Sequence, residues 1–148
     1  MSNESKTKKK GVLFLCTGNA CRSQIAEGFA KSIAPADVPI FSAGTFPAGL
    51  ISRTVMVMKE IGIDISEQYS KHIDEVPLDE IGTVITLCSS AEKFCPSLPG
   101  KKRLHWPIMD PVGTIGNEKE VLQNFREARD EIMEKVEKFF KNKEYEDE

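Results

Sequence analysis

The sequence has no apolar run of transmembrane length, and its first residues lack the apolar segment of a secretory signal peptide. Neither sign of charge dominates. The formal net charge of the 148 residues is −3, which gives no general case for binding nucleic acid or a membrane surface. The chain also has no internal repeat and no low-complexity linker. We therefore expect a cytoplasmic protein that binds neither nucleic acid nor a membrane.

The four cysteines form no Cys-X2-Cys pair, the spacing that many structural zinc sites use. We therefore predict no metal site, and no cofactor is expected. In a reducing cytoplasm, cysteines serve catalysis more often than they form structural disulfides. The four residues are thus candidates for thiol chemistry, and they are Cys16, Cys21, Cys88 and Cys95.

Both ends of the chain are polar. Four lysines fall within residues 1–10, and residues 141–148 are mostly charged. Solvated, frayed termini explain both segments. The chain is short enough to form one domain, so we expect a single domain over residues 11–140 between two flexible tails. We expect this domain to be a monomer.

Strand-like and helix-like patterns alternate along the chain. Short apolar runs predict strands over residues 11–15, 40–42, 83–87 and 102–106. Apolar stripes at helical spacing predict helices over residues 22–33, 52–61 and 118–140. Residues 64–81 are mixed, with room for a short helix after Pro77, and residues 89–98 fit a short helix or a loop. The alternation favours an α/β fold whose parallel sheet is covered on both faces.

The segment from Cys16 to Ser23 joins the first expected strand to the first expected helix. Backbone N–H groups at the start of a helix, together with the helix dipole, form a site for anions. Arg22 adds a planar set of donors that suits a tetrahedral oxyanion, and Cys16 lies where this field favours the thiolate. The segment therefore predicts a thiol nucleophile in an oxyanion-binding loop, whose other members are Thr17, Gly18, Asn19, Ala20, Cys21 and Ser23.

Two details of this loop support the interpretation. Gly18 and Asn19 tolerate left-handed backbone dihedrals, so the loop can turn its N–H groups inward. The Ser23 hydroxyl can donate to the Cys16 sulfur and further favour the thiolate. The alternative is a tight turn that holds a buried, inert cysteine.

The Cys-X5-Arg-Ser loop resembles that of the low-molecular-weight protein tyrosine phosphatase fold family. Residues 16–29 resemble the thioredoxin-coupled arsenate reductases of that family in particular. The similarity continues through residues 42–45, 61–66, 84–88, 95–96, 105–106 and 110–111. The resemblance implies a four-stranded parallel sheet in the order 2-1-3-4 with helices on both faces. Cys16 and Cys88 then end neighbouring strands and face one crevice.

The resemblance also implies a chemistry. Arsenate would bind the loop, with phosphate or sulfate as competing oxyanions, and Cys16 would attack arsenic while Asp110 protonates the departing oxygen. Cys88 would attack Cys16, forming a transient Cys16–Cys88 disulfide and releasing arsenite. Cys95 would then form the Cys88–Cys95 disulfide, which thioredoxin reduces.

The spacing of the two later cysteines adds a physical constraint. Seven residues along a helix span roughly 10 Å, whereas the two Cα atoms of a disulfide lie at most about 7 Å apart. A helix between Cys88 and Cys95 would therefore have to unwind when they pair. The alternative is two buried apolar cysteines without redox function. For Asp110 the alternative is a simple turn with Pro111, and Cys21 is expected to be structural or accessory.

Some positions depart from the family's patterns. Val112 and Gly113 stand where the phosphatases usually carry tyrosines, which argues against a phosphotyrosine substrate. Lys71 stands where some of the reductases use a carboxylate to bind potassium. The other potassium positions match, and they are Asn19, Glu27 and Ser42. We hypothesise that the Lys71 ammonium pairs with Glu27, braces Asn19 and replaces the ion. The alternative is an exposed lysine and an absent ion site.

These expectations favour an arsenate reductase. The first alternative is a low-molecular-weight phosphatase that hydrolyses aryl phosphates through Cys16, an activity that can also accompany the reductase. The second is a catalytically silent sensor of oxyanions or redox state, which the complete set of candidate residues argues against.

Overall fold

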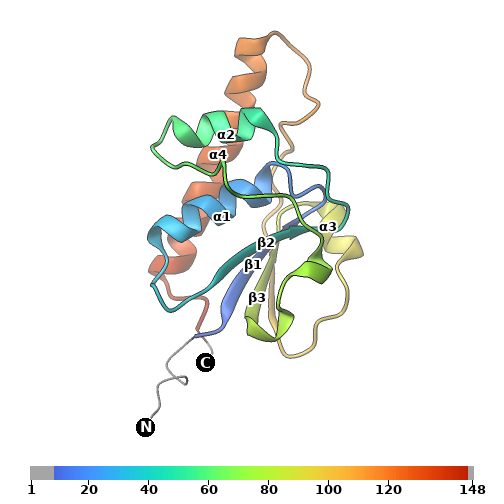
Figure 1. The fold of residues 1–148 in the computed structure, drawn as a ribbon, viewed down its shortest axis with the longest axis vertical. Coiled ribbons are helices and arrows are strands. Elements are labelled where there is room, and N and C mark those ends of the chain that lie inside the picture. Colours follow the sequence, from blue (N-terminus) through green and yellow to red (C-terminus); the bar gives the residue numbers. More distant parts are fainter. Residues whose placement is uncertain (1–8, 147–148) are drawn as a thin grey trace.

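The computed structural model describes residues 9–146, so most of the expected N-terminal tail and the last two residues lie outside the described part. Within that part, parallel strands form one sheet in the order β2-β1-β3-β4, which confirms the predicted topology (Figure 1). The strands are β1 (Gly11–Cys16), β2 (Ile40–Gly44), β3 (Ile81–Thr86) and β4 (Lys102–His105). Leu15 lies opposite Thr86, so the carboxyl ends of the central strands β1 and β3 are neighbours.

Helices cover both faces of this sheet, as predicted. Long helices pack together on one side, and they are α1 (Arg22–Ile33), α2 (Ser52–Lys59) and α4 (Glu118–Lys141). Short helices lie on the other side (Figure 1), and they are η2 (Ile73–Glu75), η3 (Leu78–Glu80) and α3 (Ser89–Phe94). Helix α3 contacts both β1 and β3, which brings the segment after β3 close to the end of β1.

The core follows from the apolar runs in the sequence. Every residue of β1 is buried, and so is every residue of β3 except Gly82, as parallel strands covered on both faces require. Helix α4 packs its predicted apolar stripe against α1 and α2. The buried stripe consists of Val121, Phe125, Ala128, Ile132, Val136 and Phe139. Asn117 and Glu120 exchange hydrogen bonds in a capping box that begins this helix.

Some element boundaries differ from the predicted ones. Helix α2 ends at Lys59 rather than at residue 61, and β3 covers residues 81–86 rather than 83–87. Cys16 is therefore the last residue of β1, whereas Cys88 follows β3 after Leu87. Pairing with β1 fixes the extent of β3, and this pairing partner is distant in the sequence.

The expected solvated tail from residue 141 does not hold for its first part. Lys143 has a φ of +52° and reverses the chain after α4. Tyr145 is only 8% exposed and packs against Phe139 and Phe140. A single aromatic ring among charged residues has no periodicity, so the sequence pattern gives no sign of this contact.

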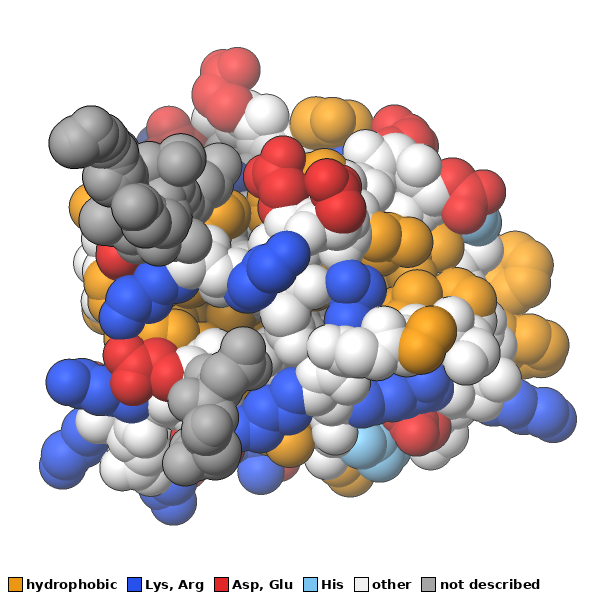
Figure 2. Space-filling model, turned by 90° about the horizontal axis from the view of Figure 1, so that it is seen from below, with side chains coloured by type: hydrophobic (Ala, Val, Ile, Leu, Met, Phe, Trp, Pro, Cys, Tyr) orange, Lys and Arg blue, Asp and Glu red, His pale blue; other side chains and the backbone are white. Residues whose placement is uncertain are grey.

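Figure 2 views the molecule from the end where β1 begins. Acidic, basic and apolar side chains all appear on this face. Nζ of Lys9 donates a hydrogen bond of 2.9 Å to Glu146 Oε2, which joins the two ends of the described chain. Among residues 9–146, no helix combines the length and the apolar character needed to cross a membrane.

Candidate active site

A cavity of about 220 Å³ lies at the carboxyl end of β1. Its walls come from the loop after β1, from the segment after β2 and from residues 110–112. Cys16 contributes to these walls and is only 2% exposed. The fold thus brings three of the five predicted catalytic residues to one cavity, and they are Cys16, Arg22 and Asp110.

The start of α1 meets this cavity. Cys21 precedes the helix, and no side chain caps its first N–H groups, so these donors remain for an anion in the cavity. The Ser23 hydroxyl lies 2.9 Å from Cys16 Sγ, in the contact that the sequence predicts. A buried thiol, a hydroxyl partner and a helix N-terminus therefore converge at one point.

Asn19 fixes the shape of the loop. Its φ of +48° lies in the left-handed region that the sequence predicts, whereas Gly18 has no positive φ. Its Nδ2 donates to Ser23 Oγ at 2.7 Å and to Ser42 Oγ at 3.0 Å. Its Oδ1 accepts a hydrogen bond of 2.9 Å from the Lys71 backbone N–H. Asn19 is fully buried, so water does not compete for these bonds.

Three further polar side chains support the loop, and the sequence analysis missed all of them. Ser70 Oγ donates to the Gly18 carbonyl at 2.9 Å, and Gln24 Nε2 donates to the Asn19 carbonyl at 3.0 Å. Gln68 Nε2 in turn donates to Gln24 Oε1 at 2.7 Å. Gln24 had a local signal, because it is a polar residue beside the apolar stripe of α1. The other two lie in the segment of mixed pattern, where only the fold reveals their contacts.

Arg22 and Asp110 meet at the wall of the cavity. Arg22 Nη1 donates to the Ile108 carbonyl at 2.9 Å, and its Nη2 lies 3.4 Å from Asp110 Oδ2. The other carboxylate oxygen of Asp110 accepts a hydrogen bond of 3.0 Å from the Val112 N–H. The turn that the Asp-Pro pair predicts is therefore present, and Asp110 also faces the oxyanion loop.

The sequence profile of the low molecular weight phosphotyrosine protein phosphatases matches residues 11–147. The chain belongs to this phosphatase family. An arsenate reductase from Halalkalibacterium halodurans is 45% identical over 132 residues, which are 88% of this chain and 95% of that protein. A solved structure of an arsenate reductase in the phosphate binding state has a TM-score of 0.78 at 33% identity, covering 90% of this chain and 98% of that one. A Corynebacterium glutamicum thioredoxin-dependent arsenate reductase has a TM-score of 0.61 at 27% identity, over 88% of this chain and 63% of its own.

This phosphatase-family chain places a second thiol against the oxyanion loop. Cys88 is 8% exposed, and its Sγ lies 3.2 Å from Thr17 Oγ1. The same sulfur accepts a hydrogen bond of 3.4 Å from the Ala91 N–H and so caps α3. Cys95 follows the last residue of α3, and both cysteines are free. Helix α3 therefore separates two thiols, of which the first touches the loop.

The remaining loop cysteine differs from these two. Burial raises the pKa of Cys21 to about 12, and a hydrogen bond with Thr54 opposes the effect only in part. Cys21 is therefore a neutral thiol near pH 7. The structural or accessory role that the family resemblance implies for Cys21 stays a prediction.

Lys71 lies beside the loop, but it braces Asn19 differently from the prediction. Its backbone N–H, not its ammonium, donates to Asn19. Lys71 Nζ lies 3.9 Å from Glu27 Oε1 and donates to the Tyr69 carbonyl at 3.0 Å, above the ring of Tyr69. Lys31 pairs with Glu27 more closely, at 2.6 Å. Burial lowers the pKa of Lys71, against an opposing effect of Glu27. The replacement of a potassium ion stays a hypothesis.

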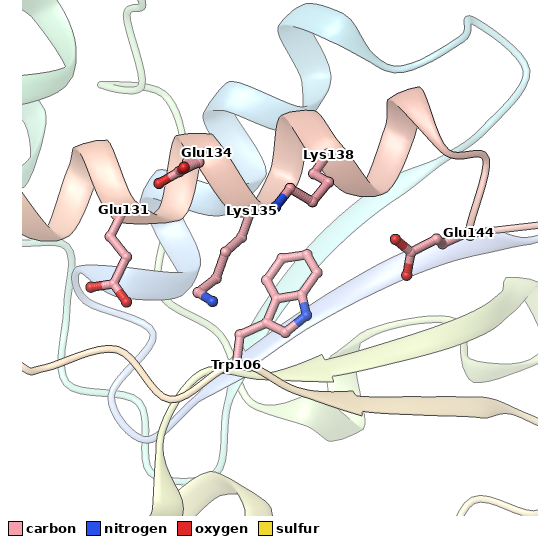
Figure 3. Close-up of a pocket in the computed structure, with 6 residues that line it drawn as sticks. All are labelled: Trp106, Glu131, Glu134, Lys135, Lys138 and Glu144. Atoms are coloured by element: carbon pink, nitrogen blue, oxygen red, sulfur yellow. The ribbon is translucent and has the colours of Figure 1, made fainter.

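A second hollow, of about 310 Å³, lies beside Trp106 and shares no residue with the cavity at Cys16. Figure 3 shows that the indole faces side chains of α4 across this hollow. Trp106 also packs against Phe14 and Phe139. The other side chains around the hollow carry both signs of charge, and they are Glu131, Glu134, Lys135, Lys138 and Glu144. No cysteine lines it, which separates it from the thiol chemistry.

Proposed function

We propose that this chain is an arsenate reductase that uses Cys16, Cys88 and Cys95 as a thiol relay and is recycled by thioredoxin. The observation that carries the proposal is the position of Cys88, whose sulfur lies 3.2 Å from Thr17 Oγ1 of the oxyanion loop. The similar proteins that are named arsenate reductases support the same activity. The thioredoxin-dependent neighbour supports thioredoxin as the reductant.

In the first step, arsenate binds to the uncapped N–H groups of the loop and to the Arg22 guanidinium. Cys16 Sγ attacks arsenic and forms an S–As bond. An arsenate oxygen leaves as water after it takes a proton from Asp110. Arg22 links these events. Its guanidinium lies 3.4 Å from Asp110, and Arg22 is also the first residue of α1, whose N-terminus would bind the anion.

The second step transfers electrons. Cys88 Sγ attacks Cys16 Sγ, the S–As bond breaks, and its electron pair stays on arsenic, which leaves as arsenite. The two sulfurs are oxidised to a disulfide while As(V) is reduced to As(III). Cys95 then attacks Cys88, and Cys16 leaves as a thiolate without further change in oxidation level. The dithiol of thioredoxin supplies the two electrons that restore Cys88 and Cys95.

The first prediction concerns Cys95. Oxidation of NADPH by arsenate, thioredoxin reductase and thioredoxin should continue over many turnovers with the wild type. Cys95→Ser should stop after at most a single turnover, because the Cys16–Cys88 disulfide then has no internal acceptor. Ser97→Ala, an exposed neighbour, serves as the matched control and should keep full turnover. Sustained turnover in Cys95→Ser would refute the relay.

The second prediction separates the reductase from the alternative, a phosphatase that acts on aryl phosphates through Cys16. The family match favours this alternative, because an oxyanion loop that accepts arsenate also accepts phosphate. Cys88→Ser should abolish arsenate turnover and leave hydrolysis of p-nitrophenyl phosphate within about twofold, since hydrolysis through a phosphocysteine needs only one thiol. Hydrolysis without any arsenate turnover in the wild type would place the chain with the phosphatases.

A further inference from the structure

One side chain of helix α3, Glu92, bonds directly to strands of the sheet. Thr86 Oγ1 at the end of β3 donates a hydrogen bond of 2.7 Å to Glu92 Oε1. Two β4 residues face the same oxygen, with Arg103 Nε at 3.5 Å and His105 Nδ1 at 3.9 Å. Arg103 Nη2 also donates to the Glu92 backbone carbonyl at 2.7 Å. The Thr86 hydrogen bond is the main cause that lowers the pKa of Glu92, so its carboxylate is charged at neutral pH.

Glu92 lies between the two proposed relay cysteines, so its contacts depend on the helix that separates them. Cys88 precedes α3 and Cys95 follows it, so an intact helix keeps the two Cα atoms roughly 10 Å apart, beyond the reach of a disulfide. The helix must unwind before Cys88 and Cys95 can pair. Glu92 lies inside the helix, so unwinding pulls its carboxylate away from Thr86 and Arg103. The contacts therefore belong to the dithiol form.

We propose that Glu92 is a positioning residue of the relay, whose contacts with Thr86 and Arg103 hold α3 helical and so favour the Cys88–Cys95 dithiol over the disulfide. The role of Cys88 and Cys95 in the relay rests on the proposed function, but the equilibrium between their dithiol and disulfide forms does not require arsenate. In the exchange step, Cys95 attacks Cys88 and displaces Cys16, with no net oxidation. The external dithiol then gives two electrons, and re-formation of the Glu92 contacts makes this reduction more favourable.

The surroundings of Cys95 agree with this role. Burial is the main cause that raises the pKa of Cys95. Arg103 lowers that pKa and Glu92 raises it. The Glu92 carboxylate thus restrains Cys95 in two ways, by holding the helix and by disfavouring the attacking thiolate. Glu92 does not line the cavity at Cys16, so it can act on the relay without touching the oxyanion.

The test measures the redox equilibrium of the full-length protein in mixtures of reduced and oxidised dithiothreitol at pH 7. After alkylation, the Cys88–Cys95 disulfide is quantified by peptide mass spectrometry. Glu92→Ala should shift the equilibrium toward the disulfide by about tenfold, since a partly exposed charge-assisted bond is lost, which equals about 30 mV. Glu92→Gln keeps an acceptor for Thr86 but loses the charge, so its shift should be smaller.

The matched control is Lys93→Ala, which truncates a neighbouring exposed charge on α3 whose ring contact stays within the helix. It should leave the equilibrium within about twofold of the wild type, as a surface charge without a partner on the sheet should. Arg103→Gln removes the β4 partner of the same contact and should shift the equilibrium in the same direction as Glu92→Ala. If Glu92→Ala proves unstable, Arg103→Gln tests the contact in its place. Hydrolysis of p-nitrophenyl phosphate should stay unchanged in Glu92→Ala, which verifies an intact Cys16 site.

Equal equilibria in wild type, Glu92→Ala and Arg103→Gln would overturn the proposal. A shift in Lys93→Ala as large as that in Glu92→Ala would overturn it too. Any substitution that weakens α3 would then favour the disulfide, and the contacts of Glu92 would have no special role. Absence of arsenate turnover in the wild type would count against the proposed function alone, since the equilibrium is measured without arsenate.

Discussion

At the scale of single residues, the loop from Cys16 to Ser23 depends on side chains that do not line the cavity. Asn19 reaches Ser23 within the loop, Ser42 on β2 and the backbone of Lys71. Glu27 accepts the Ser42 hydroxyl at 2.5 Å, which fixes the direction of that hydroxyl and leaves its lone pairs for Asn19. Cys16, the proposed nucleophile, is thus positioned through a chain of polar contacts that extends into the core.

A third prediction follows for Asn19. Asn19→Ala leaves the half-buried Lys71 N–H without its acceptor and forces alanine into a left-handed backbone conformation. We expect the free energy of unfolding to fall by about 2–4 kcal/mol, measured by urea denaturation. We also expect phosphate to become at least about tenfold weaker as an inhibitor, because the loop loses its fixed shape. Asn142→Ala, on an exposed residue after α4, is the control, and an equal loss in both variants would contradict this role.

At the scale of elements, α3 is the shortest α-helix among residues 9–146 and lies between two thiols. Besides the Glu92 contacts, it has one aromatic contact with the segment after β2. Phe94 meets Phe46 edge to face, with 5.8 Å between ring centroids, although the two residues are 55% and 60% exposed. An exposed aromatic pair adds a small stabilisation, which suits an element that unwinds in the proposed relay.

The fourth prediction uses Phe46, because its substitution leaves the helix propensity of α3 unchanged. Phe46→Ala should raise the amide hydrogen exchange rates of residues 89–95 by about twofold to tenfold, the range expected for one lost aromatic pair. The readout is exchange followed by mass spectrometry of the peptide that contains α3. Met56→Ala, at another exposed apolar residue, should not change these rates. Unchanged exchange in Phe46→Ala would show that the ring contact does not hold the helix.

At the scale of the whole molecule, an ion cluster fastens α2 to α4. Glu60 accepts hydrogen bonds from Arg126 and Arg129, and Arg129 also donates to the Val57 carbonyl at 2.9 Å. The Arg126 hydrogen bond is the main cause that lowers the pKa of Glu60. The cluster therefore ties the C-terminal end of α2 to the long helix α4.

The fifth prediction concerns the pH dependence of this cluster. The pKa of Glu60 is lower in the folded protein than in the unfolded chain, so its stabilisation is full above the unfolded pKa. It is lost as pH falls toward the folded value. At pH 7, Glu60→Gln should lower the free energy of unfolding by about 1 kcal/mol and Tm by about 3 °C. This difference should shrink below about pH 4.5. Glu137→Gln, exposed on α4, should show neither effect.

Local patterns predict much of this fold. The bounds of α1, the buried strands and the apolar stripe of α4 depend on the spacing of residues within each segment. The same holds for the loop from Cys16 to Ser23, because its thiol, its hydroxyl and its helix N-terminus lie within eight consecutive residues. Where a boundary is wrong, as at β3, the residues that decide it belong to another strand.

The sequence by itself determined the order of the elements, the parallel sheet and the strand-to-helix loop from Cys16 to Ser23, because each depends on residues close together in the chain. Only the tertiary structure decided how Cys88 meets Thr17, how Glu92 reaches Arg103, and how Ser70 and the Lys71 backbone support the loop. These contacts join residues from separate elements. Their geometry depends on strand register and helix packing, which hydrophobic periodicity does not specify.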